Sequence, residues 1–340
     1  MKDVAIAKDN PQPFQTYERE ILTRPTVGID IGGTKINAAV VVPNAADGEN
    51  CWKSLLNAPT PADSQTFLNT LVDMIDKLKR EHEVCAVGIA TAGVVDSIQG
   101  QILGSTGNMP ALANLRNLKE RLEAEVHLPV HIENDANAAA YGEWCYGAAK
   151  GARNSFAITL GTGVGMGIVF NGQMYRGSHF YAGEGGHIAI SYHRERKCTC
   201  GRWDCWEAFA SGTGLQKTAE LAVEAATETA QAEFKAKYCT NDEVTTYSVI
   251  AAWKDDNHLG QHIMDEWHHH IAVGLGSLIN VMDPDMIVVG GGLAQFVNFE
   301  LLLERTRERS MSSAFNLVPA TLGNYAGIVG AAYLAREAHF

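Results

Sequence analysis

The sequence predicts a duplicated α/β fold, in which two similar halves lie on either side of a cleft. The main observation is a pattern that occurs twice: an apolar strand, a glycine-rich turn and a second apolar strand. Such a pattern predicts a β-hairpin, because two strand-forming runs flank a short turn. The hairpins comprise the strands Val27–Ile31 and Ile36–Val42, joined at 32–34, and the strands Phe156–Leu160 and Met166–Phe170, joined at 161–165.

The elements after each hairpin follow from the spacing of apolar residues. Between Phe67 and Leu78, apolar residues recur at spacings of three and four, which predicts an amphipathic helix. The first half is further expected to contain a buried strand at Val84–Ala90, a helix at Leu115–Glu125, a short strand at Pro129–Ile132 and a helix from Asn134 onward. The second half is expected to contain a helix-rich region from Thr213 to about Met282, a strand at Met286–Val289 and an Ala-rich helix at Ile328–Arg336.

Length and charge narrow the class of protein. A chain of 340 residues is long enough for two domains or one large one. The net charge of −12 provides no overall positive field, so we expect neither nucleic acid nor an anionic membrane as a partner. The first 26 residues lack the apolar core of a signal peptide, and no uninterrupted apolar stretch of about 18 residues follows. We therefore expect a cytoplasmic protein with a loosely ordered N-terminal tail.

The first glycine loop contains the residue types that bind phosphate. Gly32 and Gly33 allow close backbone approach, and Thr34 and Lys35 add a hydroxyl and an ammonium donor. Asp30, just before the glycines, is a candidate Mg²⁺ ligand beside the phosphates. The loop is neither a P-loop nor a dinucleotide fingerprint, because a strand rather than a helix follows it. The alternative is an ordinary hairpin turn with a surface aspartate.

The second glycine loop has glycine at every second position from 161 to 167. Strand interiors avoid glycine, so this pattern is costly unless a ligand or another backbone comes close. Thr162 offers a hydroxyl between Gly161 and Gly163. The two loops together indicate a polyphosphate that lies between the halves. A glycine-rich hairpin without a ligand is the alternative.

The Asn134-Asp135 pair lies at the end of a predicted strand and opens a helix. Asp135 is compatible with two roles. It is a candidate N-cap of the helix, since aspartate is favoured at that position. It is equally a candidate base that takes a proton from a substrate hydroxyl during phosphoryl transfer.

A cysteine cluster predicts a metal site. Cys198, Cys200 and Cys205 offer three thiolates in one short loop, and His187 precedes them by eleven residues. Three Cys and one His form a closed tetrahedral set for Zn²⁺, and such a site is structural because no ligand position is left for water. Reduced free thiols or a redox pair are the alternatives.

Two carboxylates flank the predicted metal loops. Glu184 precedes His187 by three residues and Glu207 follows Cys205 by two. Carboxylates accept hydrogen bonds from sugar hydroxyls, and a zinc-bound histidine directs its second ring nitrogen to an acceptor such as a substrate hydroxyl. The pattern therefore favours a polyol substrate, with solvated surface carboxylates as the alternative.

Considered as whole motifs, the sequence resembles the ROK family of bacterial sugar kinases and related repressors, which have the actin-like ATPase (ribonuclease H-like) fold. The resemblance extends from about Val27 to the C-terminus. The motifs that carry it are GIDIGGTKI at 28–36, ENDANAAAYGE at 133–143, TLGTGVGMGIV at 159–169, GEGGH at 183–187, CTCGRWDCWEAFASG at 198–212 and DPDMIVVGGGL at 283–293. The Cys/His set together with the two glycine loops is the specific part of this resemblance.

The resemblance implies a role for each matching residue. Asp135 matches the catalytic base, which deprotonates the sugar 6-hydroxyl. The matching sugar contacts are Asn108, Asn134, Glu184, His187 and Glu207, and the zinc set is His187, Cys198, Cys200 and Cys205. The matching nucleotide contacts are Asp30, Gly32, Gly33, Thr34 and Lys35 in the first loop, Gly161, Thr162 and Gly163 in the second, and Gly291 and Gly292 on the adenosine side.

Two positions depart from the family pattern. The family usually has glycine directly before the third cysteine, where this chain has Asp204. Aspartate adopts positive φ more readily than most residues, so we expect the loop to keep its course. Met166 also occupies a position where many members have a further glycine.

The resemblance implies an ATP-dependent kinase that phosphorylates a hexose at its 6-hydroxyl, with ATP, Mg²⁺ and structural Zn²⁺. Glucose is the first expectation, and an N-acetylhexosamine such as N-acetylmannosamine or N-acetylglucosamine is the second. A sugar-sensing repressor is less expected, because only 26 residues precede the first loop; a non-catalytic sugar-binding module is a third class. We expect a homodimer or homotetramer, with a tail at 1–26, a small domain at 27–135 plus 326–340, and a large zinc-containing domain at 136–325.

Overall fold

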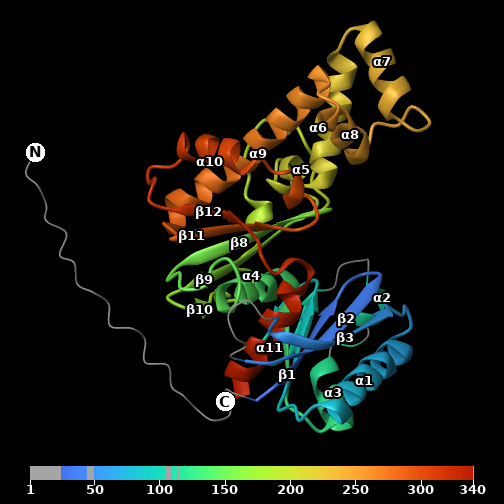
Figure 1. Cartoon of the computed structure of the whole chain (residues 1–340), viewed down its shortest axis with the longest axis vertical. Coiled ribbons are helices and arrows are strands. Elements are labelled where there is room, and N and C mark those ends of the chain that lie inside the picture. The colour runs from blue at the N-terminus through green and yellow to red at the C-terminus, as the bar shows by residue number, and fades with distance from the viewer. Residues whose placement is uncertain (1–23, 44–49, 105–108, 114, 116, 340) are drawn as a thin grey trace, which may run out of the picture.

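The computed structural model describes residues 24–43, 50–104, 109–113, 115 and 117–339 (Figure 1). Within these residues, the strands form two five-stranded sheets and one two-stranded sheet. The two large sheets lie one above the other in Figure 1, with the helices α4 and α11 between them. The described helices include none with the length and apolarity that crossing a bilayer requires.

The first sheet has the order β3-β2-β1-β4-β7. Its strands are β1 (Thr26–Ile31), β2 (Lys35–Val41), β3 (Trp52–Pro59), β4 (Val87–Thr91) and β7 (Val130–Asn134). The pairs β1–β2 and β2–β3 are antiparallel, whereas β4 lies parallel to both β1 and β7. The predicted first hairpin is therefore confirmed. β4 begins later than expected, because Val87 is its first residue paired with both neighbours.

The second sheet repeats this arrangement, with the order β10-β9-β8-β11-β12. Its strands are β8 (Ser155–Leu160), β9 (Val164–Phe170), β10 (Gln173–Met174), β11 (Met286–Gly290) and β12 (Asn316–Pro319). Again three strands are antiparallel neighbours and the last two run parallel to the central strand. The same order and the same directions in both sheets confirm the duplicated α/β fold. A separate small sheet pairs β5 (Val94–Asp96) with β6 (Gln101–Gly104).

One face of the first sheet is covered by α1 (Ser64–Glu81), α2 (Pro110–Ala113) and α3 (Leu118–Val126). Helix α1 begins after the N-cap Asp63, whose carboxylate accepts the N–H of Thr66. Its buried residues are Phe67, Leu68, Leu71, Met74, Ile75 and Leu78, so the predicted amphipathic helix is confirmed.

The helices α4 (Asp135–Cys145) and α11 (Ala326–His339) pack against each other between the two sheets. α4 also contacts β8 and β9, whereas α11 contacts β1 and β4. The approach is close because of glycine: a Cβ on Gly330 would lie 1.7 Å from the carbonyl oxygen of Ala138, and one on Gly88 would lie 1.9 Å from that of Ala331. The C-terminal helix therefore packs on the N-terminal sheet.

The remaining helices belong to the second half. They are α5 (Glu207–Ala210), α6 (Gly212–Ala225), α7 (Glu228–Tyr238), α8 (Thr246–Lys254), α9 (His258–Met282) and α10 (Phe299–Arg307), with the 3₁₀ turns η2 (Gly185–His187), η3 (Ala294–Phe296) and η4 (Gly323–Tyr325). The long helix α9 packs against α5, α6, α8 and α10, and its buried residues share a core with β8 and β11. α7 lies at the end of the molecule farthest from the first sheet (Figure 1).

Candidate active site and metal centre

A cavity of about 590 Å³ is lined by residues of both halves. The carboxyl ends of the parallel strands open onto it, which is where α/β sheets bind their ligands. Of the predicted site residues, those lining it are Asn134, Asp135, Gly161, Gly163, Glu184, His187, Glu207 and Gly291. The first glycine loop, Thr162 and Gly292 are not among its lining residues, and Asn108 lies outside the described residues.

Asp135 is the first residue of α4 and lines the cavity. The N-cap of this helix is Asn134, whose side-chain oxygen accepts the N–H groups of Ala136 and Asn137 at 2.9 and 3.1 Å. The hypothesis that Asp135 serves as the cap is therefore wrong, because extended φ and ψ place the preceding residue there. Asn134 also donates its side-chain N–H to the carbonyl of Gly93 at 3.0 Å. Both contacts hold Asn134 in place, and they thereby fix the backbone from which the side chain of Asp135 projects.

Asp135 interacts electrostatically with a second carboxyl group, that of Asp30, which does not itself line the cavity. Burial raises the pKa of Asp135, against the opposing effect of the N–H of Ala136. Burial and then the charge of Asp135 raise the pKa of Asp30 from 3.8 to about 7. Asp30 lies on β1, next but one to β7 in the sheet, so the sheet order brings the two carboxyls to one edge. A carboxylate with a raised pKa binds a proton more readily, as a general base requires.

Asp30→Asn is expected to stabilise the ligand-free protein at neutral and higher pH. Because the folded pKa of Asp30 lies above the unfolded value, its contribution to stability is present below about pH 4 and is lost as pH rises through 7. The variant should therefore exceed the wild type by about 2–4 kcal/mol at pH 8, with the difference vanishing towards pH 4. Urea unfolding across this range measures it. A difference independent of pH, or one shared by exposed Asp73→Asn, would contradict the prediction.

The glycine loops differ in their surroundings. Gly161 has open space where a Cβ would lie, and its carbonyl accepts the N–H of Gly212 at 2.8 Å. A Cβ on Gly163 would lie 2.4 Å from Glu207 Oε2, so any larger residue would displace that carboxylate. The first loop is exposed throughout Gly32–Lys35 and is held by Thr60, which donates its hydroxyl to the carbonyl of Gly32 at 2.7 Å.

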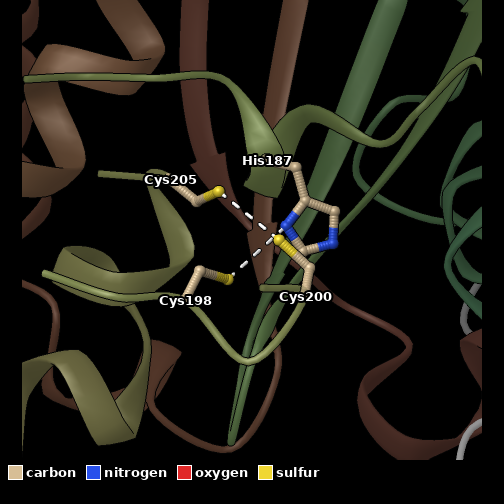
Figure 2. A group of neighbouring side chains, drawn as sticks. All are labelled: His187, Cys198, Cys200 and Cys205. Atoms are coloured by element: carbon tan, nitrogen blue, oxygen red, sulfur yellow. Dashed lines mark hydrogen bonds between the residues drawn. The ribbon is translucent and has the colours of Figure 1, made fainter. Parts of the chain in front are cut away.

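The predicted metal ligands lie together (Figure 2). The four ligand atoms of His187, Cys198, Cys200 and Cys205 are all within 4.8 Å of one another. The Sγ atoms of Cys200 and Cys205 are 3.6 Å apart, and Cys198 Sγ lies 3.8 Å from His187 Nδ1. A tetrahedral ion with Zn–S bonds of about 2.3 Å places its sulfurs about 3.8 Å apart. The donor set and its spacing therefore fit Zn²⁺.

The loop from Arg194 to Trp206, the metal loop, carries the three cysteines and is stabilised by contacts of its own. Asp204 adopts φ +58° and its carboxylate accepts the N–H groups of Arg194, Glu195 and Arg196 at 2.7–2.9 Å. These hydrogen bonds, that from Arg196 foremost, lower the pKa of Asp204. The expected positive φ is confirmed, and the carboxylate adds three contacts that a glycine lacks. Trp206 is fully buried and donates Nε1–H to the carbonyl of His270 at 2.9 Å, which anchors the loop to α9.

His187 and Glu207 connect the metal loop to the cavity. Because His187 Nδ1 lies towards Cys198, its Nε2 is the nitrogen on the side of Glu184, 3.6 Å from Oε2. Glu207 Oε2 accepts the N–H of Val164 at 3.0 Å, and its Oε1 accepts the hydroxyl of Thr199 at 3.2 Å. A single carboxylate thus bridges the metal loop and the second glycine loop.

An ion pair between the buried Glu133 and the partly exposed Arg176 has no counterpart in the sequence-based prediction, and neither residue lines the cavity. Glu133 on β7 accepts Arg176 Nε–H at 2.7 Å, Asn137 Nδ2–H at 3.0 Å and the N–H of Asn134 at 2.9 Å. Although burial opposes ionisation, hydrogen bonding from His131 and the charge of Arg176 lower the pKa of Glu133. A carboxylate in a short predicted strand, next to the apolar Ile132, was the available signal. The pair joins the strand before Asp135 to the segment that leads to Glu184.

Comparisons with known proteins identify the family and the fold. A model of the ROK family matches residues 26–338. A glucokinase of Streptomyces coelicolor is 36% identical over 322 residues, covering 92% of this chain and 98% of the relative. The crystal structure of a ROK hexokinase from Thermus thermophilus matches with a TM-score of 0.77 and 31% identity, covering 92% of this chain and 97% of the other.

A second similar structure was solved with bound ligands. It is a ROK family glucokinase from Streptomyces griseus in complex with glucose and AMPPNP, with a TM-score of 0.70, 34% identity, and coverage of 92% of this chain and 99% of that chain. These matches, together with the repeated sheet order, confirm the actin-like ATPase fold. The chain belongs to the ROK family.

Proposed function

We propose that this protein is an ATP-dependent hexokinase that phosphorylates the 6-hydroxyl of glucose. The observation that carries the proposal is one cavity lined by Asp135, by the second glycine loop and by the Glu184–His187 segment. A base, a phosphate-binding backbone and sugar-binding acceptors are the three parts that such a reaction needs. Relatives described as a glucokinase and as a glucokinase with bound glucose favour glucose as the sugar.

In the proposed mechanism, Asp135 is the general base. Its carboxylate accepts the proton of the sugar 6-hydroxyl while that oxygen forms a bond to the γ-phosphorus of ATP. The bond from the γ-phosphorus to the bridging oxygen breaks, and ADP leaves with that electron pair. The proton remains on Asp135 until the product departs. Burial, which raises the pKa of this carboxyl, favours the transfer.

The nucleotide contacts are proposals of the same kind. Gly161 and Gly163 of the second loop and the exposed Gly32–Lys35 loop would hold the phosphates, with Gly291 and Gly292 towards the adenosine. Asp30 would hold Mg²⁺, which offsets the phosphate charge when bound. Since Gly32–Lys35 does not line the cavity here, this role requires the two halves to approach when ATP binds.

The sugar contacts that we propose are Asn108, Asn134, Glu184, His187 and Glu207. The zinc site would be structural: with four protein ligands it leaves no position for water, and it fixes His187 at the cavity wall. His187 Nε2 remains available on the side of Glu184 for a sugar hydroxyl. Asn134 also caps α4, so its side chain would be held in a fixed orientation when it binds the sugar.

The domain division that we propose places 27–135 with 326–340, and 136–325 in the second domain. The packing of α11 on β1 and β4 and of α4 on β8 and β9 supports this boundary. The boundary between residues 135 and 136 lies at the start of α4, directly after β7, and leaves one large sheet in each domain.

We also propose a homodimer or homotetramer. An apolar groove of about 850 Å³ lies beside the active site, and the exposed fractions of four of its residues are high: Phe170 48%, Tyr175 52%, Tyr181 60% and Val281 84%. Exposed apolar surface of this kind favours a second copy of the chain. Light scattering should give at least twice the monomer mass, and Val281→Glu should reduce it. A monomeric wild type would contradict the proposal.

A coupled assay of ADP formation over a panel of sugars tests the function. Glucose should give the highest kcat/KM, ahead of mannose, N-acetylmannosamine and N-acetylglucosamine. A higher value for an N-acetylhexosamine would select the second candidate substrate. If none of these sugars leads to ADP formation, the kinase function is contradicted, and a sugar-sensing or sugar-binding protein is favoured.

A further inference from the structure

Phe180 is an aromatic residue in an unusual backbone conformation at the wall of the active-site cavity. It lies in the loop between β10 and η2, four residues before Glu184, and its φ is +63°. Bulky residues seldom adopt this left-handed region, because the Cβ comes too close to the carbonyl oxygen. Its half-buried side chain lines the same cavity as Glu184 and His187.

Core packing does not explain this conformation. Among the described residues, Phe180 belongs to none of the buried apolar clusters and makes no ring–ring contact. Its neighbour Tyr181 lines the separate apolar groove and not the cavity. A strained residue that gains little from the core and lies at a ligand site indicates a functional constraint.

The lining of this cavity is partly apolar and partly polar. It includes the apolar side chains of Val94, Val164, Met166 and Ala182 as well as the polar side chains of Glu184, His187 and Glu207. A hydroxyl group is small enough to remain bonded to Glu184 or His187. An N-acetyl group is larger and brings an amide N–H and a carbonyl, which lose hydrogen bonds when buried against apolar atoms.

We propose that Phe180 limits the size and polarity of the sugar substituent beside Glu184 and His187, and thereby selects a free hexose over an N-acetylhexosamine. The proposal rests on the assigned kinase function. The aromatic ring would occupy the space that an acetamido group needs and would pack against the C–H face of the sugar. Phe180 is then a specificity-determining residue that takes no part in proton or phosphoryl transfer.

The test compares Phe180→Gly and Phe180→Ala with the wild type. Each should raise the ratio of kcat/KM for N-acetylglucosamine or N-acetylmannosamine to that for glucose by at least about tenfold, as a change of pocket contact of this size does. Phe180→Gly should also retain or raise the Tm, because glycine adopts positive φ without strain. The matched control is Tyr181→Ala, which removes a ring from the same loop and should leave the ratio unchanged.

The outcomes separate this proposal from the function itself. A wild type that phosphorylates no sugar contradicts the proposed function. A wild type that phosphorylates glucose, with the ratio unaltered in both Phe180 variants, overturns the specificity proposal alone. A loss of several degrees in Tm for Phe180→Gly also overturns it, because the ring would then serve stability. Thermal shifts induced by each sugar provide a second readout that does not depend on turnover.

Discussion

Asp135→Asn is expected to lower kcat by roughly 10²–10⁴-fold while the affinity for sugar changes little. The amide cannot accept the hydroxyl proton, and general base catalysis contributes roughly 10²–10⁴-fold. The substitution keeps the size of the side chain at the start of α4, where the cap is supplied by Asn134, so the fold should persist. Initial rates of ADP formation measure the loss, and the thermal shift caused by glucose measures binding.

The pH profile gives a second readout of the same residue. Because burial raises the pKa of Asp135, kcat/KM of the wild type should rise with pH through an apparent pKa above the ordinary aspartate value of about 4. The matched control is Asp76→Asn on α1, which should retain the rate and the profile of the wild type. An Asp135→Asn enzyme within tenfold of the wild-type rate would remove Asp135 from the mechanism.

With zinc bound at the proposed four-ligand site, Cys200→Ser is expected to release the metal and to raise the KM for sugar more than it lowers kcat. Losing one of four ligands from a structural zinc site lowers metal affinity strongly, because binding and local folding are coupled. His187 and Glu207 are both tied to this loop, so the KM for sugar should rise at least about tenfold. Metal content by emission spectrometry, the Tm and the sugar KM are the measurements.

The matched control is Cys239→Ser, a partly buried cysteine after α7 that lies outside the metal cluster. It should keep the zinc content, the Tm and the sugar KM of the wild type. Chelation of zinc from the wild type should reproduce the Cys200→Ser result, and added zinc should reverse it. Full zinc content in Cys200→Ser, or unchanged kinetics after complete zinc removal, would contradict a structural role for the metal.

Elements with a strong local pattern were predictable, and those without one were not. Apolar runs in the sequence predict the hairpins β1–β2 and β8–β9, and helical spacing of apolar residues predicts α1. The edge strand β3 alternates half-buried with exposed residues, and it includes Lys53, Ser54 and Asn57. Only pairing with β2 makes it a strand, so its pattern was too weak to indicate one. β12 has four residues and depends on β11 in the same way.

The candidate site shows the same division. The Cys/His set was predictable because its spacing and donor types already satisfy zinc, and the structure brings the four side chains together. The role of Asp135 was ambiguous in the sequence, because a cap and a base require the same residue type. The backbone angles of Asn134 make that residue the cap and so exclude the cap role for Asp135, whereas the role of base stays a prediction.

The sequence by itself determined the chemistry that is available: two glycine turns, a zinc set, a carboxylate after a strand, and a repeated strand–turn–strand order. These properties depend on residues close together in the chain. Only the tertiary structure decided which of them meet. The coupling of Asp30 with Asp135, the bridge from Glu207 to Val164 and the pair of Glu133 with Arg176 all join residues far apart in sequence. Sheet order and the close packing of α4 on α11 create these contacts, and neither is a property of any short segment.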